Sequence, residues 1–269
     1  MRDYTETAAV ELPGGLPLEG APPITSVELR PLSGWEEEWL AGHAGAPPAV
    51  AVSALLDACI VSSDHPRSRL ARQLLAGDRD YLMLELRRLT LGDRVQAVLE
   101  CPACGSKVDV DFPTGDVPVE RRPQSRSGYS LDLGTGRNIT FRLPNGADQE
   151  SVAKMETSEA VETLFSRCVS ADPPLSPEER AAVISAMEER APAVELELDL
   201  TCPECGNTWA APFDTTSFFI RELTARRQYL LREVHSLAIH YHWSEAEIMS
   251  MPRARRRAYL EMLSDATRP

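Results

Sequence analysis

The stretches CPACG (residues 101–105) and CPECG (residues 202–206) decide how this chain folds. Two thiolates of a Cys-x-x-Cys turn can face one ion, and the following glycine permits the positive φ that such a turn needs. One turn supplies two ligands, whereas a closed structural zinc site takes four. We therefore predict that the two turns join in one structural Zn²⁺ site formed by Cys101, Cys104, Cys202 and Cys205.

Each cysteine turn lies between segments that alternate apolar and polar residues, as strands do. Residues 93–100 and 106–113 flank the first turn, and residues 193–201 and 207–219 flank the second. This pattern predicts an α+β protein with a zinc-ribbon-like β core of two knuckles, interrupted by a helical insertion at about 144–192. A site with four thiolates has no open position for water, which argues for a structural role and against zinc catalysis.

The remaining segments suggest three parts. Residues 1–23 are rich in proline and glycine and predict an extended or flexible arm. Residues 24–216 hold an N-terminal helical region and the zinc-ribbon body, with a turn between two helices expected at 76–80. Residues 217–269 predict a helical C-terminal extension.

Composition narrows the class of protein. The chain has 269 residues and a net charge of −13, and such an acidic surface argues against general nucleic-acid binding. No apolar run is long enough for a membrane span, and the N-terminus lacks a signal-peptide core, so we expect a cytoplasmic protein, or one incorporated into a particle. Thiols are reduced in the cytoplasm, and paired cysteines there indicate metal before disulfides. Disulfide pairs and a thioredoxin-type redox pair remain alternatives, and we expect Cys59 and Cys168 to be buried small apolar residues.

Other candidate sites are weak. The sequence HSLAIHYHW places His235, His240 and His242 close together, and we interpret them as packing or surface residues because no carboxylate is arranged near them as a hydrolase base. The loop LGTGRN lacks the Lys-Ser/Thr pair of a phosphate-binding loop. We therefore expect no enzymatic activity. A zinc enzyme that uses these histidines is a rival class.

Two parts of the sequence resemble proteins of contractile tails. Residues 72–105 (RQLLAGDRDYLMLELRRLTLGDRVQAVLECPACG) and 139–153 (ITFRLPNGADQESVA) resemble the baseplate hub assembly chaperone family. Residues 229–263 resemble the helical ends of small proteins from phage-tail and extracellular contractile injection clusters. The resemblance implies a non-enzymatic protein that helps to build a baseplate or forms part of it, with other baseplate or tail subunits as partners. It carries no catalytic residues to transfer.

The C-terminal segment is the candidate partner-binding element. From Thr215 to Pro269 it holds nine Arg against six Asp and Glu, so it contrasts with the acidic remainder of the chain. An amphipathic helical segment docks in a partner's groove or folds back on its own body, and both alternatives stay open. A zinc-ribbon nucleic-acid-binding or transcription accessory protein is the rival function. The residues expected to contact a partner are Trp243, Ile248, Met249, Arg253, Arg256 and Tyr259.

Overall fold

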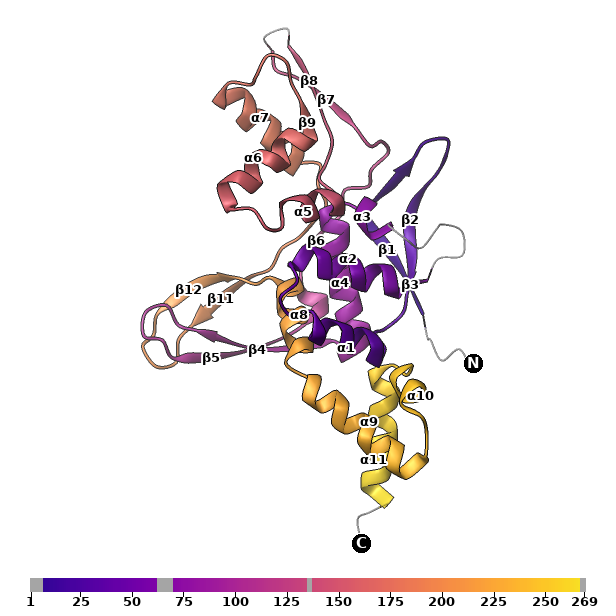
Figure 1. Ribbon diagram of the computed structural model, residues 1–269. Helices are drawn as coiled ribbons and strands as arrows, with labels where there is room; N and C mark the ends of the chain where they lie inside the picture. The colour runs from indigo at the N-terminus through magenta and orange to yellow at the C-terminus, as the bar shows by residue number, and fades with distance from the viewer. Residues whose placement is uncertain (1–6, 62–69, 135–136, 267–269) are drawn as a thin grey trace.

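The computed structural model describes residues 7–61, 70–134 and 137–266. It has mixed α+β architecture, with a helical body at the centre and three projecting parts (Figure 1). In the view of Figure 1, a pair of β-hairpins extends to the left, a lobe of helices and strands lies above the body, and three helices extend below it. We name these parts the hairpin pair (94–113 and 197–212), the insertion lobe (129–188) and the C-terminal arm (227–266).

Helix α4 (Ala76–Leu91) forms the centre of the body. Helices α1 (Gly34–Gly42), α2 (Pro48–Cys59) and α8 (Thr215–Thr224) pack around it (Figure 1). Ser33 caps α1 through a capping box, which confirms the cap predicted from the sequence. Burying each large apolar side chain of this core contributes about 1.5–3 kcal/mol. The most deeply buried of them are Leu29, Leu32, Leu40, Leu55, Leu56, Leu82, Leu86 and Phe219.

The N-terminal residues form a sheet where the sequence predicted a flexible or extended arm at 1–23. Strands β1 (Ala8–Leu18), β2 (Ala21–Leu29) and β3 (Ile60–Val61) pair antiparallel in that order, while residues 1–6 lie outside the described part of the chain. Pro13 and Pro17 are accommodated in β1 because it is an edge strand, and Pro22 and Pro23 lie in the part of β2 that has no partner on its β3 side.

An irregular stretch of β1 is tied to the central helix. The pairing shifts between Glu11 and Leu16, and the buried amides of Gly14 and Gly15, which lie between these paired residues, donate to the carboxylate of Asp78 at 2.6 and 3.0 Å. Asp78 is fully buried, so these two bonds replace the water that its carboxylate loses. The bulge thereby fixes the sheet against α4.

The helix break before α4 lies earlier than predicted. The sequence predicted a turn at 76–80, but α3 (Leu70–Gln73) ends before it and α4 begins at Ala76. Gly77 lies within the first turn of α4. This position requires glycine because an added Cβ would stand 2.0 Å from the carbonyl oxygen of Pro192. Glycine here serves close packing rather than a turn.

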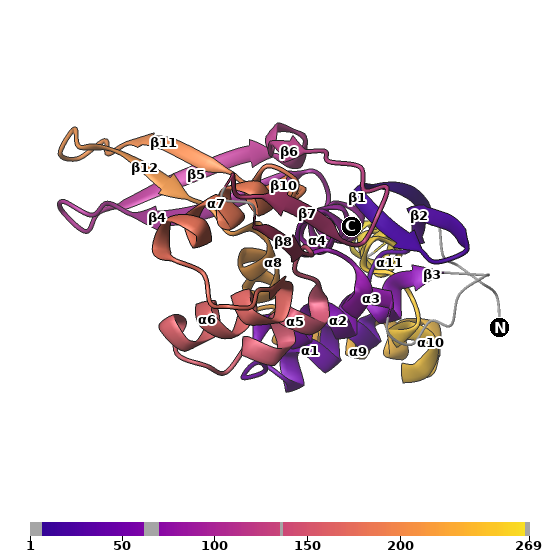
Figure 2. The same ribbon diagram turned by 90° about the horizontal axis from the view of Figure 1, so that it is seen from above.

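Two β-hairpins carry the cysteine turns at their tips. The strands β4 and β5 pair antiparallel without a register shift, and so do β11 and β12. The apolar faces of the two hairpins pack on each other, and Figure 2 shows them extending side by side with their turns at the same end. The strands are β4 (Arg94–Glu100), β5 (Lys107–Pro113), β11 (Glu197–Thr201) and β12 (Thr208–Pro212).

The insertion between the hairpins is only partly helical. Its helices are preceded by two strands, and a third strand follows α6, in the sheet order β7–β8–β9, so the insertion begins well before the predicted residue 144. The short pair of β6 and β10 brings the entry and the exit of the insertion together. The elements are η1 (Thr114–Asp116), β6 (Val119–Glu120), β7 (Tyr129–Asp132), β8 (Asn138–Phe141), α5 (Gly146–Val152), α6 (Thr157–Cys168), β9 (Val169–Ser170), α7 (Pro177–Glu188) and β10 (Ala193–Val194).

The C-terminal arm begins later than the predicted boundary at 217. Helix α8 belongs to the body, since Phe219 and Leu223 lie in its core. The chain then bends at Ala225–Arg226, between two helices that the sequence predicted as one. Ser244 caps the second helix of the arm as predicted. The arm consists of α9 (Arg227–Tyr241), α10 (Glu245–Met249) and α11 (Arg253–Ala266).

Candidate metal centre

The four predicted cysteines meet at the far end of the hairpin pair. The Sγ atoms of Cys101 and Cys205 lie 3.7 Å apart, those of Cys104 and Cys202 lie 3.6 Å apart, and all four fall within 4.8 Å of one another. Four sulfurs placed about 2.3 Å from a central ion in tetrahedral geometry lie roughly 3.8 Å apart. The sulfurs therefore have the spacing that one tetrahedral ion requires, and they are too far apart for disulfide bonds.

The two turns have the same backbone geometry. In the first turn the Gly105 amide donates to the Cys101 carbonyl oxygen at 2.9 Å, and in the second the Gly206 amide donates to Cys202 at 2.9 Å. Both glycines adopt the left-handed backbone conformation, with φ of 72° and 73°. A residue with a side chain would be strained at either position, which is why each cysteine pair is followed by glycine.

The thiols differ in exposure and in proton affinity. Cys101 and Cys202 are buried over Val108 and Trp209, whereas Cys104 and Cys205 are exposed. Each turn thus places one sulfur inward and one outward. The four sulfurs therefore lie on both sides of a central point, as the ligands of a tetrahedral ion do.

Hydrogen bonds and neighbouring sulfurs set the pKa values of the two exposed thiols. Hydrogen bonds from the side chain and the amide of Ser106 lower the pKa of Cys104 to about 6. The Asn207 amide lowers the pKa of Cys205, but the neighbouring sulfurs, together with burial, raise it to about 12. Cys104 therefore ionises more readily than Cys205, and a bound cation would favour the thiolate form of both.

The donor set limits the chemistry of the site. All four corners of a tetrahedron are sulfur, so an ion held here has no open position for water or substrate. Such a site fits a structural soft cation such as Zn²⁺. The other two cysteines, Cys59 and Cys168, are buried in apolar clusters, which confirms the expectation for them.

The histidines do not add to this site. His235, His240 and His242 are all exposed, and His242 ends α9 in a left-handed conformation with φ of 55°. Among residues 7–61, 70–134 and 137–266, the four cysteines are the only group of three or more His, Cys, Asp and Glu ligands that lie this close. The interpretation of the histidines as surface residues fits their positions.

Most of the predicted partner-binding residues lie inside the chain's own structure. Ile248, Met249, Arg253 and Arg256 are buried, and Met249 packs against Gly34 of α1. The structure therefore has the segment folded back on the body, which is one of the two alternatives left open by the sequence.

The other two candidates belong to an aromatic cluster. The ring of Trp243 stacks on Tyr241 at 4.6 Å and meets Tyr259 edge-on at 4.8 Å. Trp243 and Tyr259 are half-buried, so each keeps some surface for a partner. Contact with a partner through these two residues stays a prediction.

A buried network of ion pairs joins the C-terminal arm to the body. It was not predicted from the sequence. Arg256 is fully buried and donates to Glu37 at 2.6 Å and to Glu233 at 3.0 Å, with Arg253 3.7 Å from Glu37. Glu37 is the second residue of an acidic run at the start of α1, a pattern that sequence reasoning assigns to solvent and the helix dipole. No local signal distinguishes it from Glu36 and Glu38, which are half-buried.

Comparison with known proteins identifies a family for the chain. A family model described as T4 bacteriophage base plate protein matches residues 15–171, more than half of the chain. No curated protein and no solved structure matches significantly. Within the described ranges, no helix combines the length and apolar character needed to cross a bilayer. The matched range covers most of the N-terminal sheet, the helical body up to α4, the first cysteine hairpin and much of the insertion lobe, and on this match the chain belongs to the T4 bacteriophage base plate protein family.

Proposed function

We propose that this protein is a non-enzymatic assembly or structural protein of the baseplate of a contractile injection system or phage-tail-like particle. Membership in the base plate family carries this proposal. Within it, the role of a hub assembly chaperone rests on the resemblance of residues 72–105 and 139–153 described above. Other baseplate or tail subunits are the partners.

We further propose that one zinc ion, held by the four clustered cysteines, stabilises the hairpin pair. The spacing of the sulfurs supports this part of the proposal. Two hairpins with only a small shared apolar core gain much of their stability from such an ion. The ion would tie together the tips of two hairpins that the insertion separates in the sequence.

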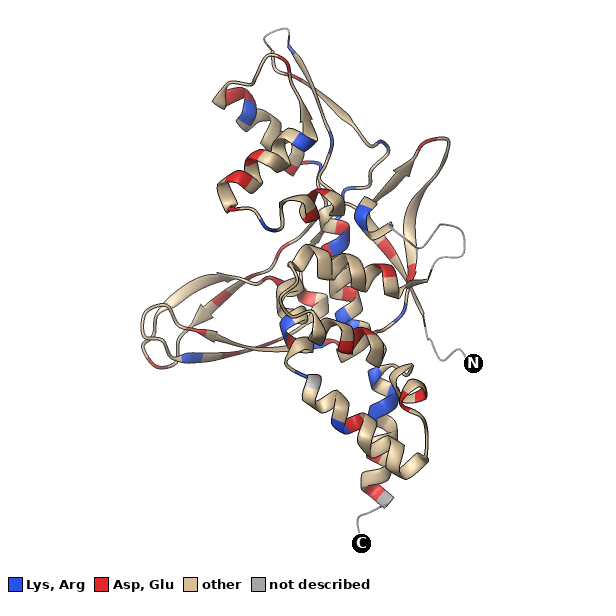
Figure 3. Ribbon diagram, in the orientation of Figure 1, with Lys and Arg blue, Asp and Glu red and all other residues tan. Residues whose placement is uncertain are grey.

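The charge distribution supports a protein partner over nucleic acid. Figure 3 shows Asp and Glu residues on the body, the hairpin pair, the insertion lobe and the C-terminal arm. The basic run at 253–257 is not a free cationic surface, because Arg253 and Arg256 are buried in ion pairs with Glu37. Phosphate backbones need clustered exposed cations.

The packing of α8 in the body core suggests where the domains divide. We infer that residues 7–225 form the body with its hairpin pair and insertion lobe, and that the extension proper begins at Arg226. Trp243 and Tyr259 are the residues of the arm proposed to contact a baseplate subunit, because both are aromatic and keep exposed surface.

Deletion of the gene from a host that produces contractile particles tests the function. We expect electron microscopy to show no sheathed particles with complete baseplates, and complementation by the wild-type gene to restore them. Mass spectrometry of purified mature particles then separates the two roles, because a structural component is retained and an assembly chaperone is not. Normal particles from the deletion strain would refute the proposal.

A further inference from the structure

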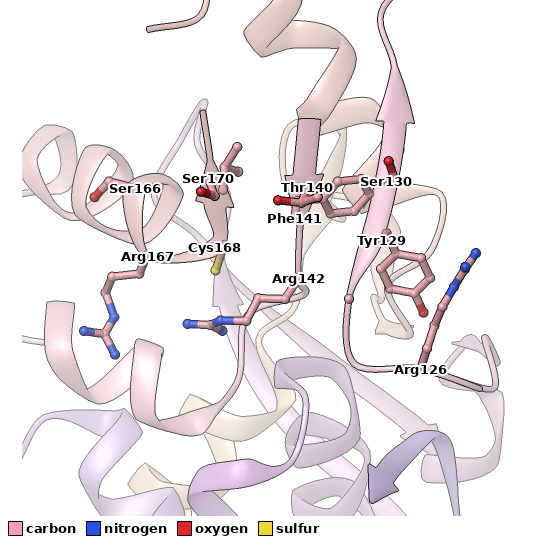
Figure 4. Close-up of a pocket in the computed structure, with 12 residues that line it drawn as sticks. Arg126, Tyr129, Ser130, Thr140, Phe141, Arg142, Ser166, Arg167, Cys168 and Ser170 are labelled. Atoms are coloured by element: carbon pink, nitrogen blue, oxygen red, sulfur yellow. The ribbon is translucent and has the colours of Figure 1, made fainter. Parts of the chain in front are cut away.

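A hollow of about 600 Å³ lies on the insertion lobe, beside the small sheet and the end of α6 (Figure 4). Three arginines line it, Arg126, Arg142 and Arg167, and none of its twelve lining residues is acidic. In a chain with a net charge of −13, a pocket wall with only cationic charge is unusual and calls for a physical reason.

A buried carboxylate holds two of these arginines in place. Arg142 Nη2 donates to Asp148 Oδ1 at 2.8 Å, and Arg167 Nε donates to the same oxygen at 2.9 Å. Burial raises the pKa of Asp148, but hydrogen bonds, first from Arg142 and then from the Asn145 amide, lower it to about 2. Asp148 therefore stays ionised, and two guanidinium groups share one negative charge. The pair keeps a net charge of +1.

The shared carboxylate leaves donors unused. Within the described residues, Arg167 donates only through Nε, so both of its Nη groups have no protein acceptor there, and its side chain is 41% exposed. Figure 4 shows the side chains of Arg142 and Arg167 pointing toward each other; the Asp148 carboxylate that both contact is not drawn there. Two such groups, oriented by a buried carboxylate, form a preorganised site for a second carboxylate.

A row of hydroxyl groups continues from the arginine pair across the sheet. Ser130, Thr140 and Ser170 are register partners on β7, β8 and β9, so they lie on one face of the sheet. All three are exposed, while the opposite face carries Phe141 and Val169 into the lobe core. This face offers hydrogen-bond partners over three strands, a length that suits an extended chain.

We propose that this hollow binds an extended acidic segment of another protein, with one carboxylate on Arg142 and Arg167 and the adjoining backbone along the hydroxyl row. Charge complementarity favours an acidic peptide over nucleic acid. The hollow has only three arginines, two of which share Asp148, and this is too few cations to follow a phosphate backbone; Arg126 also lies over the Tyr129 ring at 5.2 Å, where a base would otherwise stack. The inference goes beyond the assembly role and depends neither on it nor on the metal.

Fluorescence anisotropy of a labelled Gly-Glu-Glu-Glu-Gly peptide on the full-length protein tests the site, with Gly-Gln-Gln-Gln-Gly as the uncharged probe. Arg167→Gln removes the half-exposed donor and leaves Arg142 on Asp148, so the lobe keeps its fold. Arg180→Gln is the matched control, because Arg180 pairs with Glu162 on the same lobe, outside the hollow. A second variant, Arg126→Gln, touches only the exposed end of the pocket.

We expect the glutamate peptide to bind, the glutamine peptide to bind at least tenfold more weakly, and Arg167→Gln to weaken binding at least tenfold with an unchanged melting temperature. Arg180→Gln should bind as the wild type does, and Arg126→Gln should fall between them. Equal loss in Arg167→Gln and Arg180→Gln, equal binding of both peptides, or no binding would overturn the proposal. So would displacement by inorganic phosphate at lower concentration than by acetate. Self-association of the protein that Arg167→Gln abolishes would assign the carboxylate to a second copy and would equally overturn it.

Discussion

Replacing Arg256 by methionine should loosen the C-terminal arm from the body. The Arg256 guanidinium is fully buried and donates three hydrogen bonds, to Glu37 at 2.6 Å, to Glu233 at 3.0 Å and to the Met251 carbonyl oxygen at 2.7 Å. Methionine preserves much of the apolar volume but removes all three bonds. It leaves Glu37, which is only 4% exposed, with Arg253 as its remaining cationic partner at 3.7 Å.

The magnitude follows from that uncompensated charge. Removing one partner of a buried ion pair typically costs about 3–5 kcal/mol. Because about 1.4 kcal/mol corresponds to a factor of ten in an equilibrium constant, opening of the arm should become roughly two to three and a half powers of ten more frequent. Hydrogen exchange of the α11 amides, followed by mass spectrometry, reports this local opening directly. We expect α11 to exchange faster by that factor, or up to the rate of an unprotected helix.

Two further variants sharpen the experiment. Arg257→Met changes the neighbouring, exposed residue and should alter the opening free energy by no more than about 0.5 kcal/mol. Adding Glu37→Gln to Arg256→Met removes the unpaired charge and should recover part of the lost protection. If Arg256→Met exchanges like Arg257→Met, the arm does not bury Arg256 in solution, and the residue is free for a partner as the sequence predicted.

Purified protein should contain one zinc per chain, and Cys202→Ser should abolish the zinc measured by mass spectrometry and lower the melting temperature, since the ion contributes on the order of several kcal/mol; a zinc-free preparation of unchanged stability would contradict this. Burial, together with the nearby Asp214 carboxylate, raises the pKa of Asp80 to about 6, above its value in the unfolded chain, so the free energy of unfolding should fall as the pH rises from about 4 to about 6. Asp80→Asn should remove this loss of about 2–3 kcal/mol, so the gain in stability measured by urea unfolding should be larger at pH 7.5 than at pH 4. An equal gain at both pH values would contradict the prediction. Gly77→Ala should cost on the order of 1–3 kcal/mol in the same assay because its Cβ meets the Pro192 carbonyl, whereas Gly115→Ala, with open space around it, should be near neutral.

The sequence was sufficient to predict the hairpin pair because its signal is both local and paired. Alternation gives each strand, and the ligand requirement of one ion predicts that two distant turns meet at their tips. The structure brings Cys101, Cys104, Cys202 and Cys205 together as that argument requires. The zinc itself stays a prediction.

The elements that the sequence missed lack such a signal. Strand β1 contains prolines and two glycines that are typical of a loop, and only its edge position and its bulge make a strand possible. Strand β9, at two residues, is too short for alternation to be distinguished from chance. The break at Ala225 follows from packing, since Phe219 enters the body core while the arm leaves it.

The side-chain networks were also beyond the sequence. Arg256 reads as one residue of a solvated basic run, and its burial depends on the distant Glu37. The hollow of the insertion lobe depends in the same way on Asp148, which sequence reasoning sees only as a helix-capping acid. Such sites are set by tertiary contacts between residues that carry no common motif.

The cluster of four sulfurs also joins segments that are synthesised at different times. When Cys104 has just been added to the nascent chain, residues 105–201 are still to be synthesised, which takes about 5–20 s at ordinary rates of translation. During that interval the nascent chain holds only half of the ligands. The cluster therefore cannot close before the second hairpin has been synthesised, and a chain that stops short of Cys202 keeps two thiols without the two that complete them.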